Sequence, residues 1–255
     1  MEENLQLPSF VATACDALSN VCFENEKQRR LTAQTKAVPL LISTMKKYFD
    51  KFGIQYACAR SLGNLLSEPR AQQAFDEEAV RVLLESLNSQ FSADSQHMKG
   101  PSVAKQQENQ GLFAQHVITV LSFLVGDPKK AAIFASSGGF VTMKNLYLAV
   151  GVWEENTRQS LLSLINNMSQ NPQTAKLFID NLYEGYDMLC ELVSEADPQS
   201  QFFLQVYSIL TALERYYIGR VSHKALQQDN VKLQEAVVSL IAIGARTKDK
   251  GLDIL

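Results

Sequence analysis

One pattern recurs along this chain and constrains its fold more than any other feature. Four copies have an aliphatic residue two places before an anchor position, a Pro or Asn five places after it and an apolar residue eleven places after it. The anchors are Asn20, Asn64, Phe123 and Asn167, with a weaker copy at Thr211, so the intervals are 44, 59, 44 and 44 residues. A recurrence of this length is typical of α-helical solenoids, whose repeats run to about 40 to 47 residues.

The second interval is longer than the others by 15 residues, which indicates an insertion. Residues 89–110 account for it, because they are polar, rich in Gln and Ser, and interrupted by Gly100 and Pro101. Loops of this length are usually either functional or disordered. We interpret the segment as an inserted flexible loop, with a contact or modification element as the alternative.

The apolar residues between the anchors show helical spacing. In residues 54–66, Ile54, Cys58 and Leu62 follow one another at intervals of four and therefore share one face of a helix. Pro69 predicts the end of this helix, because the residue before a proline disfavours the helical conformation. Each interval predicts a short, a medium and a longer helix. One such set cannot bury its apolar stripes alone, so stacked sets would form a continuous core.

Composition narrows the function classes. The 255 residues carry a formal net charge of −3, whereas a nucleic-acid-binding protein normally has an excess of basic residues. The four cysteines and three histidines lack metal-ligand spacing, and no apolar run approaches a membrane span. Phosphate-binding, zinc-protease and serine-hydrolase motifs are absent, so we expect no catalysis, cofactor or metal. We expect a soluble cytoplasmic protein, reaching the nucleus, a membrane or the cytoskeleton only through a partner.

The anchor motifs resemble those of armadillo repeats. Residues 17–22 read Ala-Leu-Ser-Asn-Val-Cys and residues 61–66 read Ser-Leu-Gly-Asn-Leu-Leu, which are similar to the end of the family's third helix. Residues 37–42, Ala-Val-Pro-Leu-Leu-Ile, are similar to the next repeat's opening. The resemblance covers about residues 9–222. A HEAT-like or unclassified α-solenoid is the alternative.

This resemblance implies an all-α fold, a right-handed superhelical α-solenoid of three-helix repeats. Residues 1–255 would form a single repeat domain of about five repeats, incomplete at the N-terminal end, with residues 246–255 as a C-terminal tail. The chain opens inside a third helix. Packing on a missing N-terminal segment or in a homodimer would cover that end.

The resemblance also implies a concave groove lined by the third helices. In nuclear-import adaptors of this family, asparagines at the anchor position clamp the backbone of an extended peptide. An internal brace at the helix end is an equal alternative for Asn20, Asn64 and Asn167. Those adaptors have Trp four residues before the anchor, which this chain lacks, so we expect no binding of basic nuclear-localisation peptides. The candidate groove residues are Asp16, Asn20, Arg60, Asn64, Thr119, Phe123, Ser163, Asn167 and Thr211.

The expected function is therefore that of a non-enzymatic scaffold or adaptor, which binds a peptide or helix of a partner protein in this groove. The alternative is a regulator, an exchange factor or effector in the nucleotide cycle of a small GTPase or chaperone. That alternative follows from the fold resemblance alone.

Overall fold

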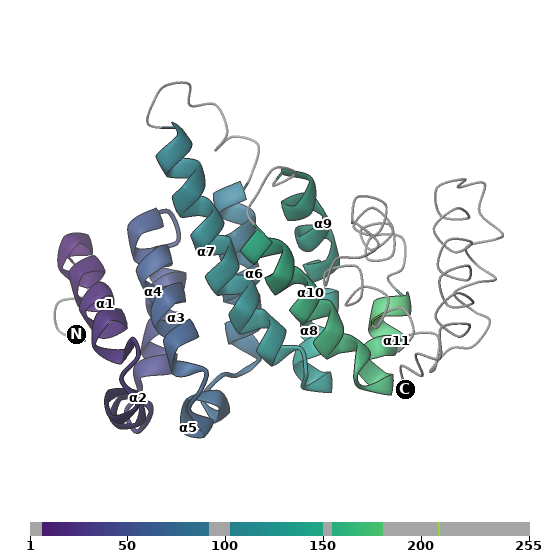
Figure 1. The fold of residues 1–255 in the computed structure, drawn as a ribbon, viewed down its shortest axis with the longest axis horizontal. Coiled ribbons are helices and arrows are strands. Elements are labelled where there is room, and N and C mark those ends of the chain that lie inside the picture. Colours follow the sequence, from purple (N-terminus) through teal and green to yellow (C-terminus); the bar gives the residue numbers. More distant parts are fainter. Residues whose placement is uncertain (1–6, 92–102, 150–154, 181–208, 210–255) are drawn as a thin grey trace, which may run out of the picture. The chain divides into compact units, whose positions relative to one another are not determined.

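The computed structural model describes residues 7–91, 103–149, 155–180 and 209, and all regular secondary structure in these ranges is α-helical (Figure 1). This confirms the all-α prediction for the described residues. The chain divides into two compact units, Met1–Met168 and Ser169–Leu255, where the sequence predicted one domain. Thr211 and the predicted tail, residues 246–255, lie outside the described residues.

The helices of the first compact unit follow the predicted order of short, medium and longer. Helix α1 comes first and is followed by three triplets of helices, α2–α4, α5–α7 and α8–α10. Helix α10 ends at the boundary between the compact units, and the second unit contributes α11, Pro172–Asp180. The bounds are α1 Pro8–Cys22, α2 Glu26–Ala33, α3 Ala37–Lys47, α4 Phe52–Leu65, α5 Pro69–Gln73, α6 Glu77–Phe91, α7 Val103–Leu124, α8 Pro128–Ser136, α9 Gly139–Ala149 and α10 Glu155–Ser169.

The predicted loop at residues 89–110 is too long. Helix α6 continues through Phe91 and α7 already begins at Val103, so only residues 92–102 separate the two helices. Residues 103–110 lack apolar periodicity but contain Ala, Lys, Gln and Glu, which are strong helix formers. Their helix propensity extends α7 beyond its apolar segment.

The residues five places after the anchors follow the end of an anchor-bearing helix and also mark the start of the next helix. Asn25 is the N-cap of α2, where its side chain accepts a hydrogen bond of 3.2 Å from the Gln28 amide. Pro69, Pro128 and Pro172 begin α5, α8 and α11. Proline suits this position because the first helical N–H has no intrahelical acceptor.

Four helices carry the anchors Asn20, Asn64, Phe123 and Asn167, and we call α1, α4, α7 and α10 the anchor helices. Helix α4 packs between α1 and α7, and a hydrogen bond from α10 reaches α7, so the four follow one another side by side (Figure 1). Helices α3 and α6 pack together behind α4 and α7.

The recurrent apolar positions form the core between these layers. Leu62, Leu121 and Ile165, two places before their anchors, are buried, as are Phe75 and Phe134 eleven places after theirs. The exceptions belong to the first copy: Leu18 is half-buried, and Leu31 on α2 is 49% exposed. The apolar pattern therefore predicts the interior of the stack and fails at its first copy.

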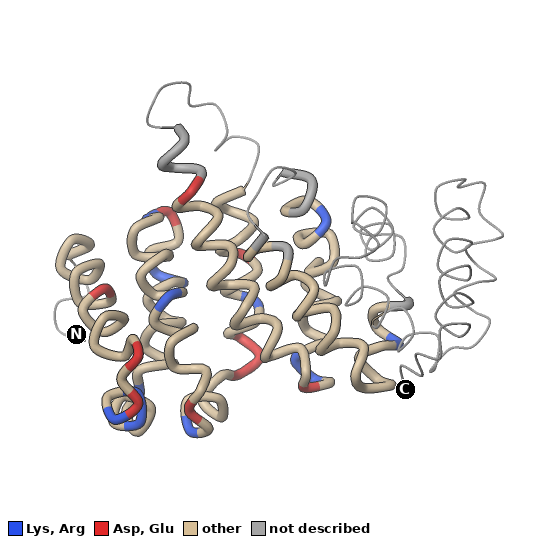
Figure 2. Tube along the Cα trace, viewed as in Figure 1, with Lys and Arg blue, Asp and Glu red and all other residues tan. Residues whose placement is uncertain are grey.

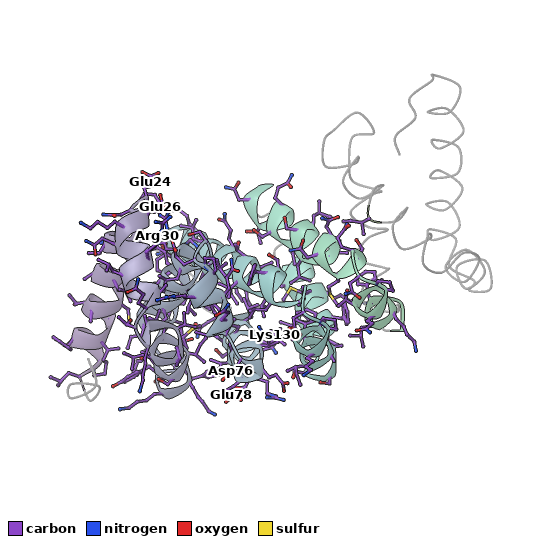
Figure 3. The ribbon with its side chains drawn as sticks, turned by 90° about the horizontal axis from the view of Figure 1, so that it is seen from below. Glu24, Glu26, Arg30, Asp76, Glu78 and Lys130 are labelled. Atoms are coloured by element: carbon purple, nitrogen blue, oxygen red, sulfur yellow. The ribbon has the colours of Figure 1, made fainter. Side chains whose placement is uncertain are left out.

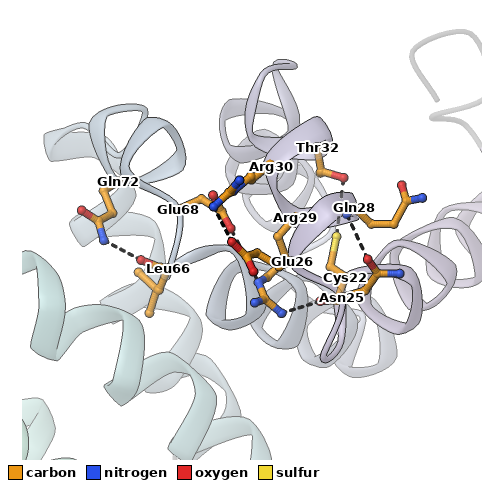
Figure 4. Close-up of polar contacts among 10 residues, drawn as sticks. All are labelled: Cys22, Asn25, Glu26, Gln28, Arg29, Arg30, Thr32, Leu66, Glu68 and Gln72. Carbon is orange, nitrogen blue, oxygen red and sulfur yellow. Dashed lines mark hydrogen bonds and ion pairs between the residues drawn. The ribbon is translucent and has the colours of Figure 1, made fainter.

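Arg29 joins the first two triplets at the end of the anchor helices. The run of residues 26–30 looks like a solvated face, and Figure 3 shows Glu26 and Arg30 projecting outward. Arg29 instead turns inward, where it donates to the Cys22 carbonyl at 3.3 Å and lies 3.8 Å from the buried Glu68 carboxylate (Figure 4). This contact ties the turn after α1 to the turn after α4.

Gln55 is a fully buried polar side chain on α4 that connects three helices. Its amide nitrogen donates to the carbonyls of Met45 and Tyr48, each at 2.8 Å, at the C-terminal end of α3. Its amide oxygen accepts from the Ser86 hydroxyl on α6 at 2.5 Å. Carbonyls at a helix end lack intrahelical partners, so Gln55 supplies a partner for the Met45 carbonyl and a second one for the Tyr48 carbonyl, which also accepts the Lys51 amide at 3.1 Å.

We expect Gln55→Leu to lower the free energy of unfolding by about 2 kcal/mol or more, because it leaves the Met45 carbonyl and the Ser86 hydroxyl without this partner in the core. Gln73→Leu on α5 is the matched control, since Gln73 is exposed. Urea denaturation followed by circular dichroism measures both. Equal stability of the two variants would contradict this role.

Candidate functional site

The anchor helices bring eight of the nine predicted groove residues into one series. Helix α1 carries Asp16 and Asn20, and the other three helices carry the equivalent pairs; Thr211 lies outside the described residues. The pairs on α4, α7 and α10 are Arg60 with Asn64, Thr119 with Phe123, and Ser163 with Asn167.

The first two pairs form one polar cluster between α1 and α4. The Arg60 guanidinium donates to the Ser19 hydroxyl at 2.7 Å and to the Asn20 side-chain oxygen at 2.8 Å. It also lies 3.6 Å from the Asp16 carboxylate and 5.9 Å from the centre of the Tyr56 ring. Arg60 therefore links the two helices, and Asp16 offsets its positive charge, so Arg60 is not a free cation.

Two of the anchor asparagines make equivalent bonds to the preceding anchor helix. The Asn64 amide nitrogen donates to the Ser19 carbonyl at 3.0 Å, and the Asn167 amide nitrogen donates to the Ser122 carbonyl at 2.8 Å. Each acceptor lies one residue before the preceding anchor. These bonds support the internal brace over the peptide clamp. Each asparagine keeps a side-chain oxygen that has no partner among the described residues.

The interface between α4 and α7 lacks this brace, because Phe123 replaces asparagine. Aromatic contacts take its place: Phe52 packs edge-on against Phe113 at 5.7 Å between ring centres, and Tyr56 packs against His116 at 5.8 Å. Phe123 itself remains 39% exposed. The series of polar anchors is thus interrupted by one accessible apolar side chain.

Thr119 and Ser163 make mainly local bonds. Each hydroxyl donates to the carbonyl four residues earlier, Thr119 to Gln115 at 2.8 Å and Ser163 to Gln159 at 2.9 Å. Thr119 also lies 3.4 Å from the Ser160 hydroxyl of α10. Their oxygens are exposed and can accept further hydrogen bonds from a ligand.

Three residues at the interfaces between these helices contact the candidate residues or one another, and the sequence analysis missed them: Tyr56, His116 and the fully buried Ser19. Ser19 could have been found, because serine precedes the anchor at both Ser19 and Ser122. Tyr56 and His116 lie on different helices and at different places relative to their anchors, so no spacing signals their contact. Their pairing depends on how α4 packs against α7.

His116 is held in its neutral form. Its burial, and to a lesser degree the positive charge of Arg60, lowers the pKa of His116 below the ordinary value of 6.5. A neutral imidazole packs against Tyr56 without adding a second cation beside Arg60.

The cysteines among these helices are buried packing groups. Cys58 donates its thiol to the Cys15 sulfur across the α1–α4 interface at 3.5 Å. This hydrogen bond, together with burial, raises the pKa of Cys58 well above its ordinary value. Among the described residues no group of three or more His, Cys, Asp or Glu side chains could hold a metal ion.

Comparison of the chain with protein-family models, curated proteins and solved structures finds no match. None of the described helices combines the length and apolar content that a membrane span requires.

We expect Asn64→Ala to lower the free energy of unfolding by about 1 kcal/mol, because the Ser19 carbonyl and hydroxyl lose a partner between two packed helices. Asn20→Ala is the matched control at the equivalent position, where only the exposed contact with Arg60 is lost. Thermal and urea unfolding measure the difference. A larger loss for Asn20→Ala would contradict the brace.

Stability should also fall as the pH drops through the ordinary range of histidine. The lowered pKa of His116 means that the unfolded chain takes up a proton at a pH where the folded chain does not, so acid favours unfolding. We expect His116→Gln to reduce the loss of unfolding free energy between about pH 7.5 and about pH 5.5, compared with the wild type. Urea titrations at both pH values test this, and an unchanged slope would contradict it.

Proposed function

We propose that this protein is a non-enzymatic interaction scaffold of the armadillo-repeat type. In this proposal the anchor helices form the wall of a groove that binds a peptide or helix from a partner protein. The observation that carries the proposal is the regular placement of equivalent residue pairs along α1, α4, α7 and α10. Side chains repeated in this way offer an extended ligand a series of similar contacts.

The contacts of these residues indicate what the ligand would be. Asp16 already pairs with Arg60, and Asn64 already uses its amide nitrogen within the protein. What remains on this surface is a set of acceptor oxygens from Asn64, Asn167 and the hydroxyl groups, together with the amide N–H donors of Asn20, whose oxygen already accepts from Arg60. A ligand would therefore supply both donors and acceptors, such as the N–H and C=O groups of an extended segment.

Phe123 supplies the apolar contact in this series. It sits at an anchor position between Asn64 and Asn167 and is accessible to solvent. Exposed aromatic residues in the centre of a binding surface often contribute most to affinity. We therefore expect the partner to place an apolar side chain against Phe123.

The test begins with affinity capture and mass spectrometry to identify a partner, followed by binding measurements with the purified partner. We expect Phe123→Ala to weaken binding at least about tenfold, in the range typical of a central aromatic residue. Val141→Ala is the matched control, because Val141 on α9 is 41% exposed and outside the anchor series, compared with 39% for Phe123.

Both variants should keep the wild-type circular dichroism spectrum, because neither side chain is buried. If Phe123→Ala binds the purified partner as tightly as the wild type does, the anchor helices are not the binding surface. Equal weakening by the two variants would contradict the assignment as well.

A further inference from the structure

Helix α1 presents an apolar stripe to solvent. Phe10, Ala14, Ala17 and Val21 are spaced at i, i+4, i+7 and i+11, which places them on one face of the helix. Phe10 is 46% exposed and Val21 is 50% exposed. Five of the seven large exposed apolar side chains among the described residues lie on or beside α1 and α2: Leu7, Phe10, Val21, Phe23 and Leu31.

The equivalent stripes on the next two anchor helices are buried against another helix. On α4, Cys58 lies 3.5 Å from the Cys15 sulfur, and the Ser61 hydroxyl donates to the Cys15 carbonyl at 3.0 Å. On α7, Phe113 packs against Phe52 of α4. The α4 and α7 stripes are buried at every position: Ile54, Cys58, Ser61 and Leu65 on α4, and Phe113, Val117, Val120 and Leu124 on α7. The stripe on α1 is therefore a helix-packing face on which none of the other described helices packs in the same way.

The charge content of α1 supports the same conclusion. A helix at a protein surface normally carries charged residues on its outer face. Asp16 is the only charged residue in α1, and Arg60 already pairs with it (Figure 2). Two such helices could approach each other without like charges meeting.

The stripe is also complementary to itself. In an antiparallel pair related by a two-fold axis, Ala14 lies opposite Ala17 of the other copy, and Phe10 lies opposite Val21. The small alanines let the two helices approach closely at the centre, and the large side chains fill the space at both ends. A two-fold interface requires this kind of self-matching surface.

We propose that the α1 stripe is an interface through which two copies of this chain pair antiparallel. This surface is distinct from the proposed groove. A single helix pair buries little area, so we expect weak association with a Kd in the micromolar range, on the order of 1 to 100 μM.

Sedimentation velocity of the full chain over about 1 to about 100 μM tests the pairing. The wild-type mass should rise from 28.4 kDa toward twice that value with concentration. Val21→Lys should stay monomeric, because pairing would bury an unpaired charge. Val141→Lys is the matched control, the same substitution at a similarly exposed valine on α9, and should associate like the wild type. A monomeric wild type, or unchanged association of Val21→Lys, would overturn the proposal.

Cysteine cross-linking tests the orientation. An equimolar mixture of Ala14→Cys and Ala17→Cys chains, oxidised with glutathione disulfide, should form more cross-linked dimer than either variant alone. The wild-type chain treated in the same way corrects for its native cysteines. Efficient cross-linking of Ala14→Cys by itself would instead indicate parallel pairing and overturn the antiparallel arrangement.

Discussion

At two of the three interfaces between successive anchor helices, a side-chain amide bonds to a backbone carbonyl of the preceding helix and holds the two helices in register. The Ser19 carbonyl accepts the Phe23 amide at 2.9 Å to close α1, and accepts Asn64 of α4 with its second lone pair. A carbonyl has a fixed place along its helix, so a bond to it prevents one helix from sliding along the other. Apolar contacts alone would allow several nearly equivalent packings. Asn167 repeats this bond at Ser122, which makes it a property of the stack rather than of one contact.

At the α4–α7 interface, aromatic rings hold the two helices in register instead. Phe52 with Phe113, and Tyr56 with His116, pack edge-on, a geometry that aromatic pairs prefer. Because the register of α4 and α7 does not depend on the anchor side chain, the Phe123 side chain can remain exposed to solvent. This departure from the repeated pattern is thus the place where the protein can offer an apolar contact to a ligand. Burial of His116 in the same interface lowers its pKa.

Much of the helix order could be predicted from the sequence, because it rests on local chemistry. Pro69 and Pro128 mark helix starts, and the phenylalanines eleven places after the anchors point inward. The role of the asparagines stayed open, since an amide suits a peptide and a helix end equally. Gln55 could not have been identified, because its partners lie on other helices: the Met45 carbonyl on α3 accepts from it and the Ser86 hydroxyl on α6 donates to it only once those helices pack.

The proposed groove and the proposed α1 interface could be occupied at the same time. Asn20 and Val21 are consecutive residues, and consecutive side chains on an α-helix point about 100° apart. Asn20 and Asp16 face Arg60 on α4, whereas Val21 shares its face with Phe10. Pairing through Val21 would therefore leave the anchor residues of both copies accessible. Two copies would present two grooves, and a partner with two binding segments would then bind with an avidity that neither groove has alone.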